Sequence, residues 1–184
     1  WRQTKYRIGG HEDLDDMATA VEAALAFVAG HRVEEVTSLA DEIFDERFED
    51  KLYDDTIAMA RRHVGAGEPV WLVSAAPIEL ATVIARKLGL TGALGTVSEI
   101  VDGVYTGGLV GDMLHGAAKA EAIRALAARE GLELSRCSAY SDSANDLPML
   151  AAADVSVAYH AKTVVRVKAT YAIDHCGLDG VINL

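Results

Sequence analysis

The chain has 184 residues, of which 51% are hydrophobic and 24% charged, and its 17 basic and 28 acidic side chains give a formal net charge of −11. This length and apolar content fit one globular domain with a small appendage and exclude an intrinsically disordered chain. The negative charge excludes a broad grip on nucleic-acid phosphates, and no apolar run reaches the roughly 20 residues that a membrane-spanning helix needs.

The first 67 residues carry acidic amphipathic helical patterns and almost no strand signal. Asp13 suits the cap of a helix whose apolar residues recur every three or four positions as far as Val28. The same period predicts two further helices, over 33–43 and 57–64. We therefore expect this part of the chain to be mostly helical.

From Pro69 onward, short apolar runs alternate with helical patterns. Asp102-Gly103 lies between two apolar pairs and predicts a hairpin over 97–110 with a type I′ turn. The remaining predicted strands are 70–73, 137–141, 155–159 and 170–173, and the predicted helices are 78–88, 117–130 and 146–153. This alternation predicts a doubly wound α/β fold with a parallel sheet, in which ligands lie beyond the carboxyl ends of the strands.

Polar residues follow two of these predicted strands. Ser74 comes directly after the first strand, where its hydroxyl and the neighbouring backbone N–H groups suit a phosphate oxygen, although a serine there more often serves only as a helix cap. Asp142 and Asp146 follow the second strand in the sequence Ser-Asp-Ser-Ala-Asn-Asp. Such a cluster of oxygen ligands suits Mg²⁺, while Asp142, Asn145 or Asp146 would also cap the next helix.

Lys119 lies near the start of the predicted helix 117–130. A cation in the first turn of a helix interacts unfavourably with the helix dipole, so its position calls for another reason. A phosphate beyond the strand ends would supply that reason, because lysine acts as a point charge on phosphoryl oxygens. A solvent-exposed surface lysine is the alternative.

The order of these residues resembles the haloacid dehalogenase (HAD) superfamily of phosphatases, and within it the phosphoserine phosphatase-like subfamily. The motifs are Val-Ser-Ala-Ala-Pro with Ser74, Gly-Ala-Ala-Lys-Ala with Lys119, and Ser-Asp-Ser-Ala-Asn-Asp with Asp142 and Asp146. The hairpin Val-Asp-Gly-Val-Tyr-Thr-Gly and the later Val-Ala-Tyr-His-Ala-Lys add to the likeness, which covers about 50–184. It implies a Rossmann-like core over 68–184 and a small all-helical cap formed by most of 1–67.

The resemblance also implies a mechanism and a set of roles. Ser74 would hydrogen-bond the transferring phosphoryl oxygens, and Lys119 would neutralise charge on the phosphate and on the nucleophile. Phosphoryl transfer depends on positioning and charge neutralisation, which explains this mixture of groups. The implied catalytic residues are Ser74 and Lys119, the substrate-binding residues are Ser74, Ala75, Lys119 and Asn145, and the ligands of the cofactor Mg²⁺ are Asp142 and Asp146.

The chain departs from the family at the nucleophile. These enzymes attack phosphorus with the first aspartate of a D-x-D motif that follows a buried strand. Asp13-Leu14-Asp15 has the spacing but follows no strand pattern, and Asp54-Asp55-Thr56 lacks the spacing. Because the chain begins with Trp1 rather than methionine, we expect the D-x-D segment upstream of Trp1, and we expect these 184 residues alone to be inactive.

Two further departures concern the substrate. Ala75-Ala76 stands where phosphoserine phosphatases tend to have glycines, and Ser141 and Ser143 replace glycines that are common around the fourth motif. Both changes preserve the proposed phosphate chemistry and weaken the case for phosphoserine. It remains the leading candidate among small phosphorylated metabolites.

The leading interpretation is therefore a Mg²⁺-dependent phosphomonoester hydrolase that acts on a small phosphorylated substrate. The alternative is a non-catalytic HAD-like protein that binds a phosphorylated ligand or a protein partner. A receiver or nucleotide-binding domain would need a lysine on a strand or a G-x-G-x-x-G sequence, and neither is present. With no basic-then-apolar leader and no cysteine pair at a metal-binding spacing, we expect a cytoplasmic protein that binds neither nucleic acid nor membrane.

Overall fold

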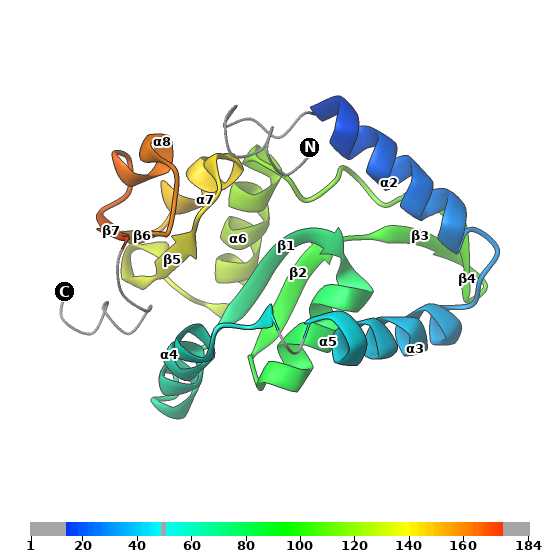
Figure 1. Cartoon of the computed structure of the whole chain (residues 1–184), viewed down its shortest axis with the longest axis horizontal. Helices are drawn as coiled ribbons and strands as arrows, with labels where there is room; N and C mark the ends of the chain where they lie inside the picture. The colour runs from blue at the N-terminus through cyan, green and yellow to red at the C-terminus, as the bar shows by residue number, and fades with distance from the viewer. Residues whose placement is uncertain (1–13, 49–50, 175–184) are drawn as a thin grey trace.

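The computed structural model describes residues 14–48 and 51–174 (Figure 1). Its N-terminal part is helical: α2 (Leu14–Val28), α3 (Val33–Ile43), a π-helical turn (Phe44–Phe48) and α4 (Asp54–Gly65). The three helices predicted here are confirmed, while the proposed cap residue Asp13 lies outside the described residues. Leu14 and Asp15 lie in α2, while Asp13 and the residues before it lie outside the described residues.

The remaining described residues alternate between strands and helices. In chain order they form β1 (Trp71–Pro77), α5 (Ile78–Leu88), β2 (Gly92–Thr96), β3 (Ser98–Val101), β4 (Val104–Leu109), α6 (Ala117–Glu130), β5 (Ser138–Ser141), α7 (Leu147–Leu150), β6 (Val155–Tyr159), α8 (Thr163–Arg166) and β7 (Tyr171–Ile173). Short 3₁₀ turns cover Leu134–Arg136 and Ala144–Asp146. The predicted α/β class is confirmed.

The strands form two parallel groups and one antiparallel hairpin. β1 pairs with β2, and β5, β6 and β7 pair in that order, all in parallel. Figure 1 shows the two parallel groups as separate units. Within the described residues, β1 and β5 each pair with one neighbour, so each strand presents an unpaired edge.

The predicted hairpin is β3–β4, and its turn has the predicted chemistry. Asp102 and Gly103 adopt φ values of +52° and +78°. Positive φ at both central residues is what a type I′ turn requires, and aspartate and glycine tolerate it better than other residues.

The structure corrects three details of the predicted elements. Residues 92–96, with the sequence Gly-Ala-Leu-Gly-Thr, form β2, although two glycines in five residues give a poor strand signal. β1 extends through Ser74 to Pro77, with an irregular register after Val73. The helix predicted over 146–153 covers only Leu147–Leu150, and just before β6 the N–H of Asp154 donates to the carbonyl oxygens of Leu134 and Cys137.

Small clusters of buried side chains join these elements. Phe44 and Ala40 pack against Val83 of α5, so the N-terminal helices lie against the first parallel pair. Met59 of α4 packs against Val157 and Ile173 of the second parallel group. Both contacts cross the predicted boundary at residue 67, and the division into a cap over 1–67 and a core over 68–184 stays a prediction.

Tyr105 of β4 connects three parts of the chain. Its backbone N–H donates to His31 O at 3.0 Å, and its carbonyl accepts from Gly30 N at 2.9 Å, which fixes the hairpin to the turn between α2 and α3. Its hydroxyl donates to Glu79 Oε1 of α5 at 2.7 Å. Burial, reinforced by the Glu79 carboxylate, raises the pKa of Tyr105 well above its usual range, so the hydroxyl keeps the proton that it donates.

Gly95 provides a test of how closely β2 approaches the junction between β1 and α5. A Cβ atom at Gly95 would lie 2.7 Å from the Ile78 Cα and 2.9 Å from the Ala76 carbonyl oxygen. Because backbone atoms cannot give way cheaply, we expect Gly95→Ala to lower the free energy of unfolding by about 1–3 kcal/mol in urea titrations. The matched control is Gly65→Ala, where a Cβ atom meets nothing within 4 Å, and stability should stay equal or rise by up to about 1 kcal/mol. Equal stabilities for the two variants would contradict the close approach.

Candidate functional site

A buried ion pair lies at the carboxyl end of β5. Lys119 Nζ, from the first turn of α6, donates to Asp146 Oδ1 at 2.7 Å. Both residues are only 8% exposed. The cation that sequence analysis placed unfavourably in a helix N-terminus is therefore compensated by a carboxylate that lies 27 positions later in the chain.

The loop that follows β5 is held by its own serines. Ser141 Oγ donates to Asp146 Oδ2 at 2.7 Å and accepts from Ser143 N at 3.1 Å. Ser143 Oγ in turn accepts from Asn145 N at 3.2 Å. Asp142 is the exposed member of this loop. Ser143 therefore caps the 3₁₀ turn Ala144–Asp146, while Asp146 stands at the N-cap position of α7 without a capping hydrogen bond from its side chain.

Ser74 lies inside β1 rather than after it. Its Oγ accepts a hydrogen bond from Ala76 N at 3.1 Å, so the local backbone fixes the side chain. Within the described residues the hydroxyl donates no hydrogen bond that competes for its proton. A group in this state can donate to an anionic oxygen at the end of β1.

Thr96, for which the sequence patterns indicate no role, connects two of the predicted motifs. This residue at the end of β2 is 6% exposed. Its Oγ1 donates to Ala75 O at 2.8 Å and accepts from Leu114 N at 3.1 Å. One hydroxyl thus joins the backbone next to Ser74 to the segment that leads into α6 and Lys119.

The structure brings some of the predicted site residues together directly. Lys119 and Asp146 are in contact, and Asp142 and Asn145 belong to the same loop. Ser74 and Ala75 reach this group indirectly, through Thr96. Because the carboxyl ends of parallel strands lie at the same edge of a sheet, we predict that Ser74, Lys119 and Asp142 converge on one pocket.

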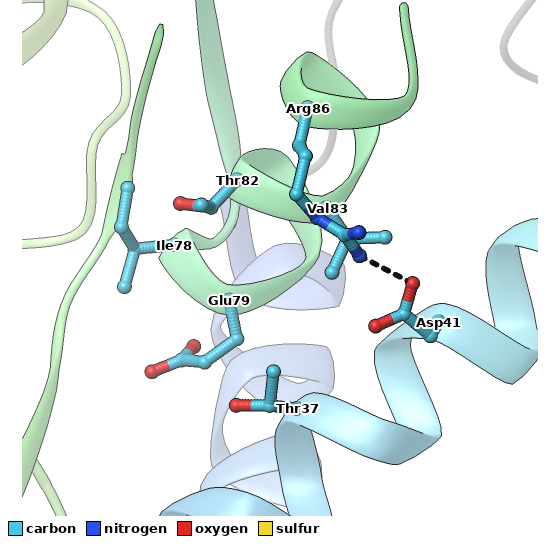
Figure 2. Close-up of a pocket in the computed structure, with 7 residues that line it drawn as sticks. All are labelled: Thr37, Asp41, Ile78, Glu79, Thr82, Val83 and Arg86. Atoms are coloured by element: carbon cyan, nitrogen blue, oxygen red, sulfur yellow. Dashed lines mark hydrogen bonds and ion pairs between the residues drawn. The ribbon is translucent and has the colours of Figure 1, made fainter.

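A shallow pocket of about 520 Å³ lies elsewhere, between α3 and α5 (Figure 2). Figure 2 shows Arg86 reaching across it to Asp41, at a distance of 2.5 Å. The lining includes Glu79 and Thr37 but none of the residues that sequence analysis assigned to the site. It marks the junction of the N-terminal helices with α5.

Lys119 and the loop after β5, together with Ser74 of β1, carry groups that can bind an anion and one hard oxygen ligand. Lys119 supplies a cation with little access to water, where electrostatic attraction is strongest, and Ser74 supplies a hydroxyl proton. Asp142 supplies an exposed carboxylate, and Mg²⁺ in proteins typically takes one or two carboxylates and keeps several waters. Over residues 14–48 and 51–174, no three His, Cys, Asp or Glu side chains gather closely enough to form a metal site by themselves. In the same ranges, none of the helices has the length and apolar character to cross a membrane.

The family model for haloacid dehalogenase-like hydrolases matches residues 5–151, which include Ser74, Lys119, Asp142 and Asp146. The chain belongs to this family. The matched range includes Ser74, Lys119 and the Asp142–Asp146 loop, and the roles that the resemblance implies for them stay a prediction. The parallel strands and the helical N-terminal part agree with this fold.

Similar proteins of known name extend this picture. Phosphoserine phosphatase SerB1 of Mycobacterium tuberculosis is 51% identical over 166 residues, which is 90% of this chain and 54% of that protein. A probable phosphoserine phosphatase from Vibrio cholerae matches with a TM-score of 0.68 and 25% identity, over 97% of this chain and 52% of the other. A Bordetella pertussis protein of unknown function matches with a TM-score of 0.76 and 27% identity, over 94% of this chain and 78% of the other. The chain spans about half the length of the curated relatives it matches.

Thr96 gives a direct test of the connection between the motifs. We expect Thr96→Val, which keeps the shape of the side chain, to leave the buried N–H of Leu114 without its acceptor and to lower the free energy of unfolding by about 1–3 kcal/mol. Urea titration measures the change. The matched control is Thr82→Val on the exposed surface of α5, which should change stability by less than about 0.5 kcal/mol. A Thr96→Val variant as stable as this control would show that the hydroxyl makes no net contribution.

Proposed function

We propose that the full-length protein is a Mg²⁺-dependent phosphomonoester hydrolase that works through an aspartyl-phosphate intermediate. The observation that carries this proposal is the buried Lys119–Asp146 ion pair, which holds a cation against the loop after β5 that also carries the exposed Asp142. A fixed cation next to a carboxylate that is free to bind a metal ion is the arrangement that phosphoryl transfer requires.

Each side chain has a role in the proposed reaction. Lys119 neutralises charge on the phosphoryl oxygens, Ser74 donates its hydroxyl proton to one of them, and Asn145 supports the phosphate side of the site. Asp142 holds Mg²⁺, which would supply positive charge beside the phosphoryl group. Asp146, whose two oxygens already accept from Lys119 and Ser141, acts on the site by holding Lys119.

The nucleophilic aspartate is proposed to lie on a further strand between β1 and β5. Within the described residues both strands have an unpaired edge; β1 carries Ser74 and Ala75 near its carboxyl end, and β5 is followed by Asp142 and Asp146. A parallel strand between them would join the two groups into one sheet. Its carboxyl end would then place a D-x-D motif between Ser74 and Asp142, since parallel strands end at the same edge.

The proposed substrate is a small phosphorylated metabolite, with phosphoserine as the leading candidate. The support is the name of the relative from Mycobacterium tuberculosis, a phosphoserine phosphatase that is 51% identical to this chain. Ala75 and Ala76 directly follow Ser74, at positions where phosphoserine phosphatases tend to have glycines. Substrate specificity can therefore differ from theirs at this point.

The proposal is tested by hydrolysis of an aryl phosphate by the full-length protein. We expect Asp142→Asn and Lys119→Gln each to lower kcat/KM about 100-fold or more, because each removes a charge that the transition state needs. Asp142→Asn should also abolish Mg²⁺ binding in calorimetric titration while leaving the circular dichroism spectrum unchanged. The control is Asp154→Asn, an exposed aspartate at the opposite end of β6 from the proposed site, which should behave as wild type. Hydrolysis that survives Lys119→Gln, or Mg²⁺ binding that survives Asp142→Asn, would contradict the assignment.

A further inference from the structure

Asp146 makes two strong hydrogen bonds, one through each carboxylate oxygen. Oδ1 accepts from Lys119 Nζ and Oδ2 accepts from Ser141 Oγ, both at 2.7 Å. The side chain is about nine-tenths buried, so the protein rather than water sets its orientation. The position of the Lys119 ammonium therefore depends on how firmly this carboxylate is held.

The direction of the hydrogen bond from Ser141 follows from its second contact. Ser141 Oγ accepts from the backbone N–H of Ser143 at 3.1 Å, so its own proton is left for the carboxylate. A hydroxyl that donates to an ionised carboxylate makes a charge-assisted hydrogen bond, which is stronger than a bond between neutral groups. Ser141 thus holds Oδ2 in place while Ser143 N–H holds Ser141 in place.

We propose that Ser141 is a positioning residue for phosphate binding, acting through Asp146 on Lys119. The inference rests on the proposed function and adds to it a residue that touches neither phosphate nor metal. Ser141 is the last residue of β5 and directly precedes Asp142, so one side chain ties the strand end to the buried ion pair. Alanine or glycine at this position lacks the hydroxyl, which leaves Asp146 Oδ2 unsatisfied and lets the carboxylate rotate away from Lys119.

The experiment measures the binding of inorganic phosphate to the full-length protein in the presence of Mg²⁺, by calorimetric titration. We expect Ser141→Ala to weaken phosphate binding about fivefold, the effect of losing one hydrogen bond's net contribution. Ser141→Thr keeps the hydroxyl and should restore binding to within about twofold of wild type. Ser138→Ala, at the exposed start of the same strand, is the matched control and should leave binding unchanged.

A double-mutant cycle separates positioning from a loss of stability. In a Lys119→Gln background the cation is absent, so adding Ser141→Ala should cause no further loss of phosphate affinity. Each variant is compared well below its midpoint of thermal unfolding, and Ser141→Cys, which substitutes a weaker donor, replaces Ser141→Ala if the latter does not fold. Ser141→Cys should then fall between wild type and the loss expected for alanine.

The outcomes distinguish this inference from the proposed function. If Lys119→Gln weakens phosphate binding but Ser141→Ala does not, Ser141 has no positioning role and the proposed function stands. If Ser141→Ala weakens binding equally with and without Lys119, its effect does not pass through the ion pair and the inference is overturned. If the wild type binds no phosphate, or Lys119→Gln leaves binding unchanged, both the proposed function and the inference fail.

Discussion

The ion pair between Lys119 and Asp146 is the interaction on which the site depends. Two opposite charges that are both about nine-tenths buried are stable only because each satisfies the other, and removing one partner from such a pair typically costs about 3–5 kcal/mol. The pair joins the first turn of α6 to the end of the loop after β5. It therefore fixes the two segments that carry most of the proposed catalytic groups. The Lys119 ammonium that makes this contact is also the group proposed to bind the phosphate.

A second set of contacts positions the part of the site that contains Ser74. β2 is short and contains two glycines, yet Gly95 lets its backbone lie against the junction of β1 and α5, and Thr96 ties Ala75 to Leu114. Ser74 and Lys119 are 45 positions apart in the sequence. Within the described residues their side chains do not contact each other directly. They are connected through the hydroxyl of Thr96, which joins Ala75 to Leu114.

The patterns that predicted the fold correctly are local ones. Apolar residues at helical spacing located α2, α3 and α5 nearly to the residue, and Asp102-Gly103 identified the turn of the hairpin. β2 could not be predicted in this way, because its glycines are required by close contacts with residues from another part of the chain. From composition alone, this segment is predicted to be a loop, because the contact with β1 and α5 is not visible in the sequence.

The candidate site was predictable in composition but not in its internal connections. The order of Ser74, Lys119, Asp142 and Asp146 indicated the family, which the family model confirms. That Lys119 pairs with Asp146, and that Ser141 supports the pair, follows from packing between segments that sequence spacing does not encode. Ser141 in particular stood out only as a replacement for a glycine, and its hydroxyl acquires a meaning once Asp146 is placed beside it.

The contacts of Tyr105 have a consequence for how the N-terminal helices can move. Two main-chain hydrogen bonds join the turn between α2 and α3 to β4, and the phenol joins β4 to the first turn of α5. The turn, the hairpin and the start of α5 therefore travel as one body. Any displacement of α2 and α3 relative to α5 would have to break these hydrogen bonds or carry the hairpin with it, and Glu79 lies only two residues after the end of β1, the strand that carries Ser74.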